Sequence, residues 1–121
     1  MNLTAITLFV EDLPAAKEFY ARTFAARPVY EDPDSAVFKL GGTLVNLLRV
    51  QAAPELIAPA QVGSPEGVRA QYTLTVDDVD ATVATLQERG IALLNGPIDR
   101  PWGVRTASFR DPAGHVWEIA K

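Results

Sequence analysis

The chain has 121 residues, of which 48% are apolar, with a formal net charge of -4 and no cysteine. This size and composition are typical of one soluble globular domain. Disulfides, thiolate metal sites and cysteine nucleophiles are excluded, and the missing basic patch argues against nucleic-acid binding. No apolar stretch approaches the roughly 20 residues of a membrane helix, and a signal-peptide pattern is absent. We therefore expect a cytoplasmic protein that binds neither nucleic acid nor membranes.

Two segments of the chain resemble each other. Residues 5–16 read AITLFVEDLPAA and residues 71–82 read QYTLTVDDVDAT. Such self-similarity indicates an internal repeat. The residues between the halves, 51–69, are rich in proline and glycine, which is typical of a connecting loop. The sequence thus predicts a single domain, residues 1–121, made of a first module (1–50), a connecting loop (51–69) and a second module (70–121).

The first module has a clear order of elements. Apolar residues alternate over residues 5–10, which predicts a strand. Asp12 suits a helix N-cap, Pro14 is tolerated in the first turn, and apolar side chains then recur at helical spacing. Three strand-like runs follow, at residues 28–30, 36–40 and 43–50, with a glycine turn between the last two.

The second module repeats this order. A strand at residues 71–76 is followed by Asp78 as N-cap, and Gly90 fits the left-handed position that ends a helix. Strand-like runs at residues 91–94, 105–109 and 115–119 complete the module. Each half is therefore β-α-β-β-β, and we expect an α/β (α+β) fold.

A strand covered by a helix on one side buries alternate residues there. The apolar alternates of each first strand face the helix, so the remaining residues form an opposite face. From the first and last strands we assign to that face Ala5, Thr7, Phe9, Leu44, Asn46, Leu48, Gln71, Thr73, Thr75, Val116, Glu118 and Ala120. A few polar groups among apolar ones are typical of a small-molecule pocket, here expected between the two halves.

Two stretches carry a family resemblance. They are TLFVEDL at residues 7–13, followed by Ala16, Phe19 and Tyr20, and the tail PWG at 101–103 with FRDPAGHVWEI at 109–119. They resemble the vicinal oxygen chelate superfamily of glyoxalase I, extradiol dioxygenases, and fosfomycin- and bleomycin-resistance proteins. The resemblance implies paired β-α-β-β-β modules that form an open barrel-like cavity, and a homodimer. It is specific for the fold but not for function, because this fold hosts many reactions.

The resemblance also implies four metal-ligand positions, at the start of the first strand and near the middle of the last strand of each module. They hold Ala5, Asn46, Gln71 and Glu118, and only Glu118 matches the usual ligands. A catalytic zinc site needs about three protein ligands. Ala5 has no donor atom, and neutral amides bind transition metals weakly. We therefore expect no metal and no other cofactor, and we place the chain nearest to the metal-free bleomycin-resistance-like members.

Without a metal, Glu118 has three interpretations. It is a cavity carboxylate hydrogen-bonded by Gln71 or Asn46, a general base of a metal-free enzyme, or an anchor for a cationic ligand. Sequence alone leaves all three open.

Further side chains are candidates near the pocket. Trp102, in a Pro-Trp-Gly loop, either stacks on the ligand, as the resemblance implies, or packs on its own module. Arg105 is a candidate for an anionic group on the ligand, although its strand face is ambiguous, whereas Arg49 points to the surface. His115 alternates with Glu118 and is expected to be structural or exposed.

The residues support two main functional hypotheses. The first is a metal-independent small-molecule binding protein that sequesters a drug or natural product, with ligand contacts from Thr7, Phe9, Asn46, Gln71, Thr73, Trp102, Arg105 and Glu118. The alternative is a lyase, isomerase or oxygenase of the glyoxalase/dioxygenase group that uses Glu118 as base or as a residual metal ligand. A third reading is a regulatory module whose cavity is vestigial. The conformations of residues 51–69 and 94–104, which shape the pocket, do not follow from periodicity.

Overall fold

A computed structural model describes every residue from Met1 to Lys121. The chain divides into two compact units, residues Met1–Ser64 and Pro65–Lys121, and each unit contains one predicted module. No helix is long and apolar enough to cross a membrane.

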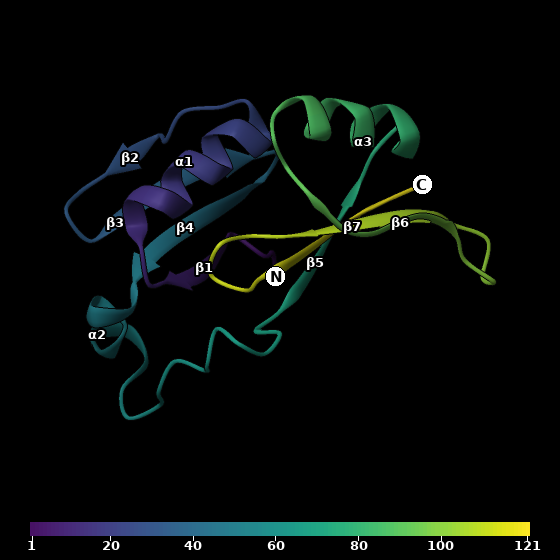
Figure 1. Ribbon diagram of the computed structural model, residues 1–121. Coiled ribbons are helices and arrows are strands. Elements are labelled where there is room, and N and C mark those ends of the chain that lie inside the picture. Colours follow the sequence, from purple (N-terminus) through teal and green to yellow (C-terminus); the bar gives the residue numbers. More distant parts are fainter. The chain divides into compact units, whose positions relative to one another are not determined.

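The first unit is built around one four-stranded sheet (Figure 1). Its elements are β1 (Ala5–Val10), α1 (Leu13–Phe24), β2 (Tyr30–Glu31), β3 (Ser35–Leu40) and β4 (Thr43–Arg49). The sheet order is β1-β4-β3-β2, with β1 parallel to β4 and the other pairs antiparallel. The predicted β-α-β-β-β module is confirmed.

The second unit repeats this topology. Its elements are β5 (Gln71–Thr75), α3 (Val79–Glu88), β6 (Leu93–Asp99), β7 (Arg105–Arg110) and β8 (Val116–Ala120). The sheet order is β5-β8-β7-β6, and β5 runs parallel to β8. A mixed sheet of this kind follows from the α-helical crossover between β5 and the rest of the module, because parallel neighbours need a long connection.

Both main helices begin where the sequence predicts. The backbone N–H of Ala15 donates to Asp12 Oδ1 at 3.0 Å, and that of Ala81 donates to Asp78 Oδ1 at 3.0 Å. Each N-cap carboxylate satisfies a backbone donor that the first helical turn leaves without a partner. Gly90 has a φ of 80°, as predicted for the end of α3, whereas α1 ends at Ala25 with a φ of 49° that the sequence does not signal.

The helix-side face of each sheet forms a separate core. In the first unit Tyr20 packs near Phe38, with ring centroids 6.3 Å apart, and Leu8 and Val45 are fully buried. In the second unit the rings of Tyr72 and Trp117 lie 5.1 Å apart. These apolar sets lie on the strand faces that contact α1 and α3, so the predicted alternation is confirmed.

Residues 51–69 are more regular than the expected connecting loop. A short 3₁₀ helix, Val50–Ala52, precedes the helix α2, Pro54–Ile57. Ala53 joins the two and is buried. The sequence indicates a connecting segment here but does not indicate its short helical part, because proline at the first position of a helix favours helix initiation as readily as it marks a loop.

One glycine of the second unit permits a close backbone contact. Gly114, in the turn before β8, has a φ of 89°, and a Cβ placed there would lie 2.5 Å from the carbonyl oxygen of Pro65. Both observations require a residue without a side chain. Residues 65–67 thus pack directly on the turn that leads into the strand carrying Glu118.

We expect Gly114→Ala to destabilise the protein by about 2 kcal/mol or more, because the variant combines a strained φ with a backbone clash. Gly42→Ala is the matched control, since Gly42 has no positive φ and its Cβ would meet no atom within 4 Å. Urea unfolding of both variants measures the difference. Equal free energies of unfolding for the two variants would contradict the assigned contact.

Candidate functional site

The face of the second sheet that points away from α3 carries a cluster of polar side chains. Glu118 of β8 has Thr73 as its register partner on β5 and Ser108 as its register partner on β7. Thr106 lies opposite Ala120 on the same face. We call this surface, made by Gln71, Thr73, Thr106, Ser108 and Glu118, the polar face.

Glu118 lies at the centre of the polar face and is half-buried. The Thr73 hydroxyl donates to its Oε1 at 3.0 Å. Within the unit its second oxygen, Oε2, accepts no hydrogen bond, and no cation forms an ion pair with the carboxylate. A carboxylate accepts about four hydrogen bonds, so most of its acceptor capacity is open to a ligand.

Two members of the polar face are buried. Thr106 is 1% exposed, and Ser108 is 3% exposed. The hydroxyl of Ser108 forms no hydrogen bond within the unit. No fully buried side-chain polar atom lacks a partner, so the small exposed part of Ser108 includes the hydroxyl. The polar face therefore offers a carboxylate and a hydroxyl on neighbouring strands.

The corresponding face of the first sheet is more apolar. Thr7 lies opposite Asn46, and the amide Nδ2 of Asn46 donates to Thr7 Oγ1 at 3.4 Å. Val37 lies opposite Asn46 on the other side, where the second unit has Ser108. Phe9 is half-buried on the same face. The sequence-predicted residues of this unit thus share one sheet face, but its polar part is a single amide–hydroxyl pair.

Gln71 lies on the polar face at the start of β5 and is exposed. Its register partner is Val116, one step along the face from Glu118. No hydrogen bond joins Gln71 to Glu118; the hydroxyl of Thr73 is the group that holds the carboxylate instead. Gln71 and Thr73 therefore stand where the strand alternation predicted them.

Trp102 lies in the turn between β6 and β7 and is 71% exposed. The rest of the chain therefore covers only a small part of this residue. The guanidinium of Arg100 lies 5.9 Å from the centroid of its ring. Arg100 Nε also donates to Thr106 Oγ1 at 2.9 Å, which ties the arginine to the polar face.

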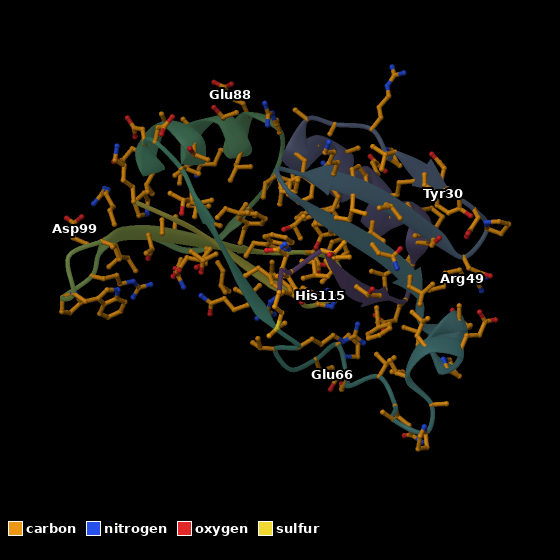
Figure 2. The ribbon with its side chains drawn as sticks, turned by 180° about the vertical axis from the view of Figure 1, so that it is seen from behind. Tyr30, Arg49, Glu66, Glu88, Asp99 and His115 are labelled. Atoms are coloured by element: carbon orange, nitrogen blue, oxygen red, sulfur yellow. The ribbon has the colours of Figure 1, made fainter.

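Arg105 does not belong to the polar face. It alternates with Thr106, and its guanidinium donates to Asp80 at 2.9 and 3.0 Å and to Asp99 at 2.9 Å. These two carboxylates raise the pKa of Arg105 above its ordinary value, with Asp80 the larger cause. Figure 2 labels Asp99 at the far end of the β6–β7 hairpin. Arg105 is thus engaged in an exposed ion-pair network, and we leave it out of the site.

Arg49 behaves as the alternation predicts. Its guanidinium forms an exposed ion pair with Asp34 at 3.0 Å. The loop between β2 and β3 that holds Asp34 is fixed by Asp32, which accepts hydrogen bonds from the backbone N–H groups of Asp34 and Ser35 and from the Tyr30 hydroxyl. The backbone hydrogen bond from Asp34 is the main reason why the pKa of Asp32 is lowered. The charged groups of Arg49, Asp34 and Asp32 thus stabilise the loop between β2 and β3.

His115 is structural. Its Nδ1–H donates to Asp111 Oδ2 at 2.8 Å, and both side chains are buried. The other oxygen of Asp111, Oδ1, accepts from the backbone N–H groups of Ala113 and His115 at 2.9 and 2.8 Å. One carboxylate thus holds the whole turn before β8, and it is the hydrogen-bond partner of the buried histidine.

We expect Asp111→Ala to lower the free energy of unfolding by about 3 kcal/mol or more, because three buried donors lose their acceptor. Asp34→Ala is the matched control, because it breaks only an exposed ion pair worth about 0–1 kcal/mol. Thermal and urea unfolding measure both. A loss in Asp111→Ala no larger than that of the control would contradict the structural role of the buried pair.

The residues at the four positions that the family resemblance links to metal ligands do not fit a transition metal. Ala5 has no donor atom, and Asn46 directs its Nδ2 to Thr7. No group of three or more histidine, cysteine, aspartate or glutamate side chains is arranged to hold a metal ion. One carboxylate with neutral amides does not fit zinc, nickel or iron.

Sequence reasoning missed Ser108, Thr106 and Arg100 as members of the site. A signal for the first two existed, because Ala107 and Phe109 are the apolar alternates of β7 and imply that Thr106 and Ser108 lie on the opposite face. Nothing in the local sequence indicates that Arg100 reaches Thr106, because that contact depends on the path of the β6–β7 turn.

Paired β-α-β-β-β modules, each with one helix-free sheet face, define a class of duplicated α+β proteins. Residues 2–119 match the model of the Glyoxalase/Bleomycin resistance protein/Dioxygenase superfamily, and the chain belongs to this superfamily. The fold and family expected from the sequence are thereby confirmed.

Individual relatives agree with this assignment. The chain is 31% identical to the uncharacterised protein YraH of Bacillus subtilis over 126 residues, covering 100% of this chain and 98% of YraH. Among solved structures, a glyoxalase/bleomycin resistance protein/dioxygenase from Nocardioides has a TM-score of 0.88 at 27% identity, over 99% of this chain and 82% of that one. A glyoxalase-related enzyme from Fulvimarina pelagi has a TM-score of 0.82 at 27% identity, over 98% and 86% of the two chains.

Proposed function

We propose that the protein binds a small organic molecule on the polar face without the help of a metal ion. The observation that carries the proposal is the state of Glu118: Thr73 holds one carboxylate oxygen, while the other is open beside the Ser108 hydroxyl. Groups held in place before binding lose little conformational entropy when a ligand arrives. In this proposal Glu118, which the resemblance links to a metal-ligand position, binds an organic group by hydrogen bonds instead.

The proposal extends to a role in sequestration. A binder that holds a drug or natural product, in the manner of bleomycin-resistance proteins, needs affinity but no bond-making step. The exposed indole of Trp102 supports this role, because an aromatic face open to solvent can stack on a planar ligand. We expect Gln71 and Thr73 to supply hydrogen bonds beside Glu118.

Ligand-induced stabilisation tests the proposal. We expect compounds from a panel of planar drugs and natural products to raise the melting temperature equally with and without a chelator, since a ligand at 100 times its Kd adds about 2.7 kcal/mol of stability. Glu118→Gln should abolish the shift, whereas Glu88→Gln, an equivalent change on an exposed position of α3, should keep it. A shift that appears only with added zinc, nickel, iron or manganese would contradict metal independence, and the absence of any shift would contradict binding.

A second candidate function is catalysis with Glu118 as general base. The open Oε2 favours this candidate, because a general base must reach the proton that it removes. The Fulvimarina relative is named a glyoxalase-related enzyme, which makes lyase, isomerase or oxygenase chemistry the class to assay. Turnover of a panel ligand that Glu118→Gln abolishes while binding persists would identify an enzyme.

We also propose that the protein is a homodimer. In the second unit β6 is an edge strand, and it carries the exposed side chains Leu94 and Ile98. Exposed apolar residues on an unpaired edge are a template for association.

Light scattering tests the association. We expect the mass of a dimer for the unaltered chain at micromolar concentration and a shift toward monomer for Leu94→Lys, because a charge would have to be buried. Leu56→Lys, an equivalent change at another exposed leucine, is the control. A monomeric mass for the unaltered chain would contradict the proposal.

A further inference from the structure

The carboxylate of Glu118 on the polar face and the guanidinium of Arg100 beside it are not paired with each other. Glu118 lies at the centre of this face, and Arg100 is fixed at one end through its hydrogen bond to Thr106. Within the second unit neither side chain forms an ion pair. Two opposite charges that share a surface but remain separate can each interact with a different part of one ligand.

The strand register gives the spacing of these charges. Ser108 lies opposite Glu118, and Thr106, two residues along β7, lies opposite Ala120. Two residues of a strand span about 7 Å. Arg100 Nε lies 2.9 Å from Thr106 Oγ1. The distance from the guanidinium to the carboxylate of Glu118 is therefore about that of two strand residues.

Arg100 is also held in position before any ligand binds. Its Nε is used by Thr106, and its guanidinium lies over the ring of Trp102 at 5.9 Å from the centroid. The terminal amino groups of Arg100 form no hydrogen bond within the unit. A guanidinium fixed at Nε presents these groups as a ready donor pair for a carboxylate or a similar anion.

The other arginines near the face lack this arrangement. Arg105 is on the opposite face and is occupied by Asp80 and Asp99. Arg110 lies on the same face as Ser108, at the end of β7, but it is exposed and no contact fixes its guanidinium. Arg100 is therefore the cation that the fold positions beside the carboxylate.

We propose that the polar face selects a dipolar ligand, with an ammonium or amidinium group at Glu118 and Ser108 and a carboxylate-like anion at Arg100. This inference rests on the proposed binding function and names its ligand class. The cationic end replaces the water around Glu118 Oε2 with charge-assisted hydrogen bonds. Trp102 lies next to Arg100, so a ring or chain that joins the two ends has an aromatic surface beside it.

Three related aromatic probes test this inference on the unaltered protein. They are 4-(aminomethyl)benzoate, which carries both charges, benzylamine, which carries only the cation, and 4-methylbenzoate, which carries only the anion. We expect calorimetric titration at low salt to show that the dipolar probe binds roughly tenfold or more tightly than either singly charged probe. A dipolar probe no tighter than benzylamine would overturn the inference.

Charge-removing variants assign each end of the probe. Arg100→Gln should weaken the binding of the dipolar probe and of 4-methylbenzoate roughly tenfold and leave the binding of benzylamine unchanged. Glu118→Gln should weaken the binding of benzylamine roughly tenfold and leave the binding of 4-methylbenzoate unchanged. Arg110→Gln and Glu88→Gln are the controls and should change none of the three affinities. Loss of the dipolar probe in Arg110→Gln but not in Arg100→Gln would overturn the assignment of the anionic end.

The outcomes separate this inference from the proposed function. If panel compounds bind in a manner that depends on Glu118 while the dipolar probe has no advantage, the ligand class is wrong and the binding function stands. If neither the panel nor any probe binds, both are wrong.

Discussion

The parallel pairing of the first and last strands in each module is the constraint on which the site depends. Because β1 pairs with β4 and β5 with β8, residues from opposite ends of a module become direct neighbours. In the second unit this pairing places Thr73 beside Glu118, although 45 positions separate them. The helix that connects the strands covers one face of the sheet, so the chemistry of the other face is free to vary without damage to the core.

The internal repeat shows how the two faces differ. The pair Thr7 and Asn46 of the first unit corresponds in register to Thr73 and Glu118 of the second. The threonine is the same in both, while an amide has been exchanged for a carboxylate. The neighbour on the third strand is valine in one unit and Ser108 in the other. The same backbone thus supports a nearly apolar surface in one module and an acceptor-rich surface in the other.

Local signals account for what could be predicted. The Asp12 and Asp78 caps, the glycine at the end of α3 and the alternation of apolar residues each act within a few positions of the chain, so the modules and their faces follow from the sequence. The hydrogen bonds of Arg105 to Asp80 and of Arg100 to Thr106 depend instead on neighbours in the tertiary structure. Side chains with five donors find partners from several elements, and no local pattern selects among them.

The two arginines that flank the β6–β7 turn illustrate this division of roles. Arg105 is matched by two carboxylates, so its charge is compensated on the helix side of the sheet. Arg100 is bound by a neutral hydroxyl and an aromatic ring, and neither cancels its charge. If Asp80 and Asp99 lay beside Arg100 instead, they would compensate its charge, and no free cation would lie beside Glu118 at the Thr106 end of the polar face. The positions of Asp80 and Asp99 therefore help to decide which kind of ligand the face attracts, because they leave one cation compensated and the other available.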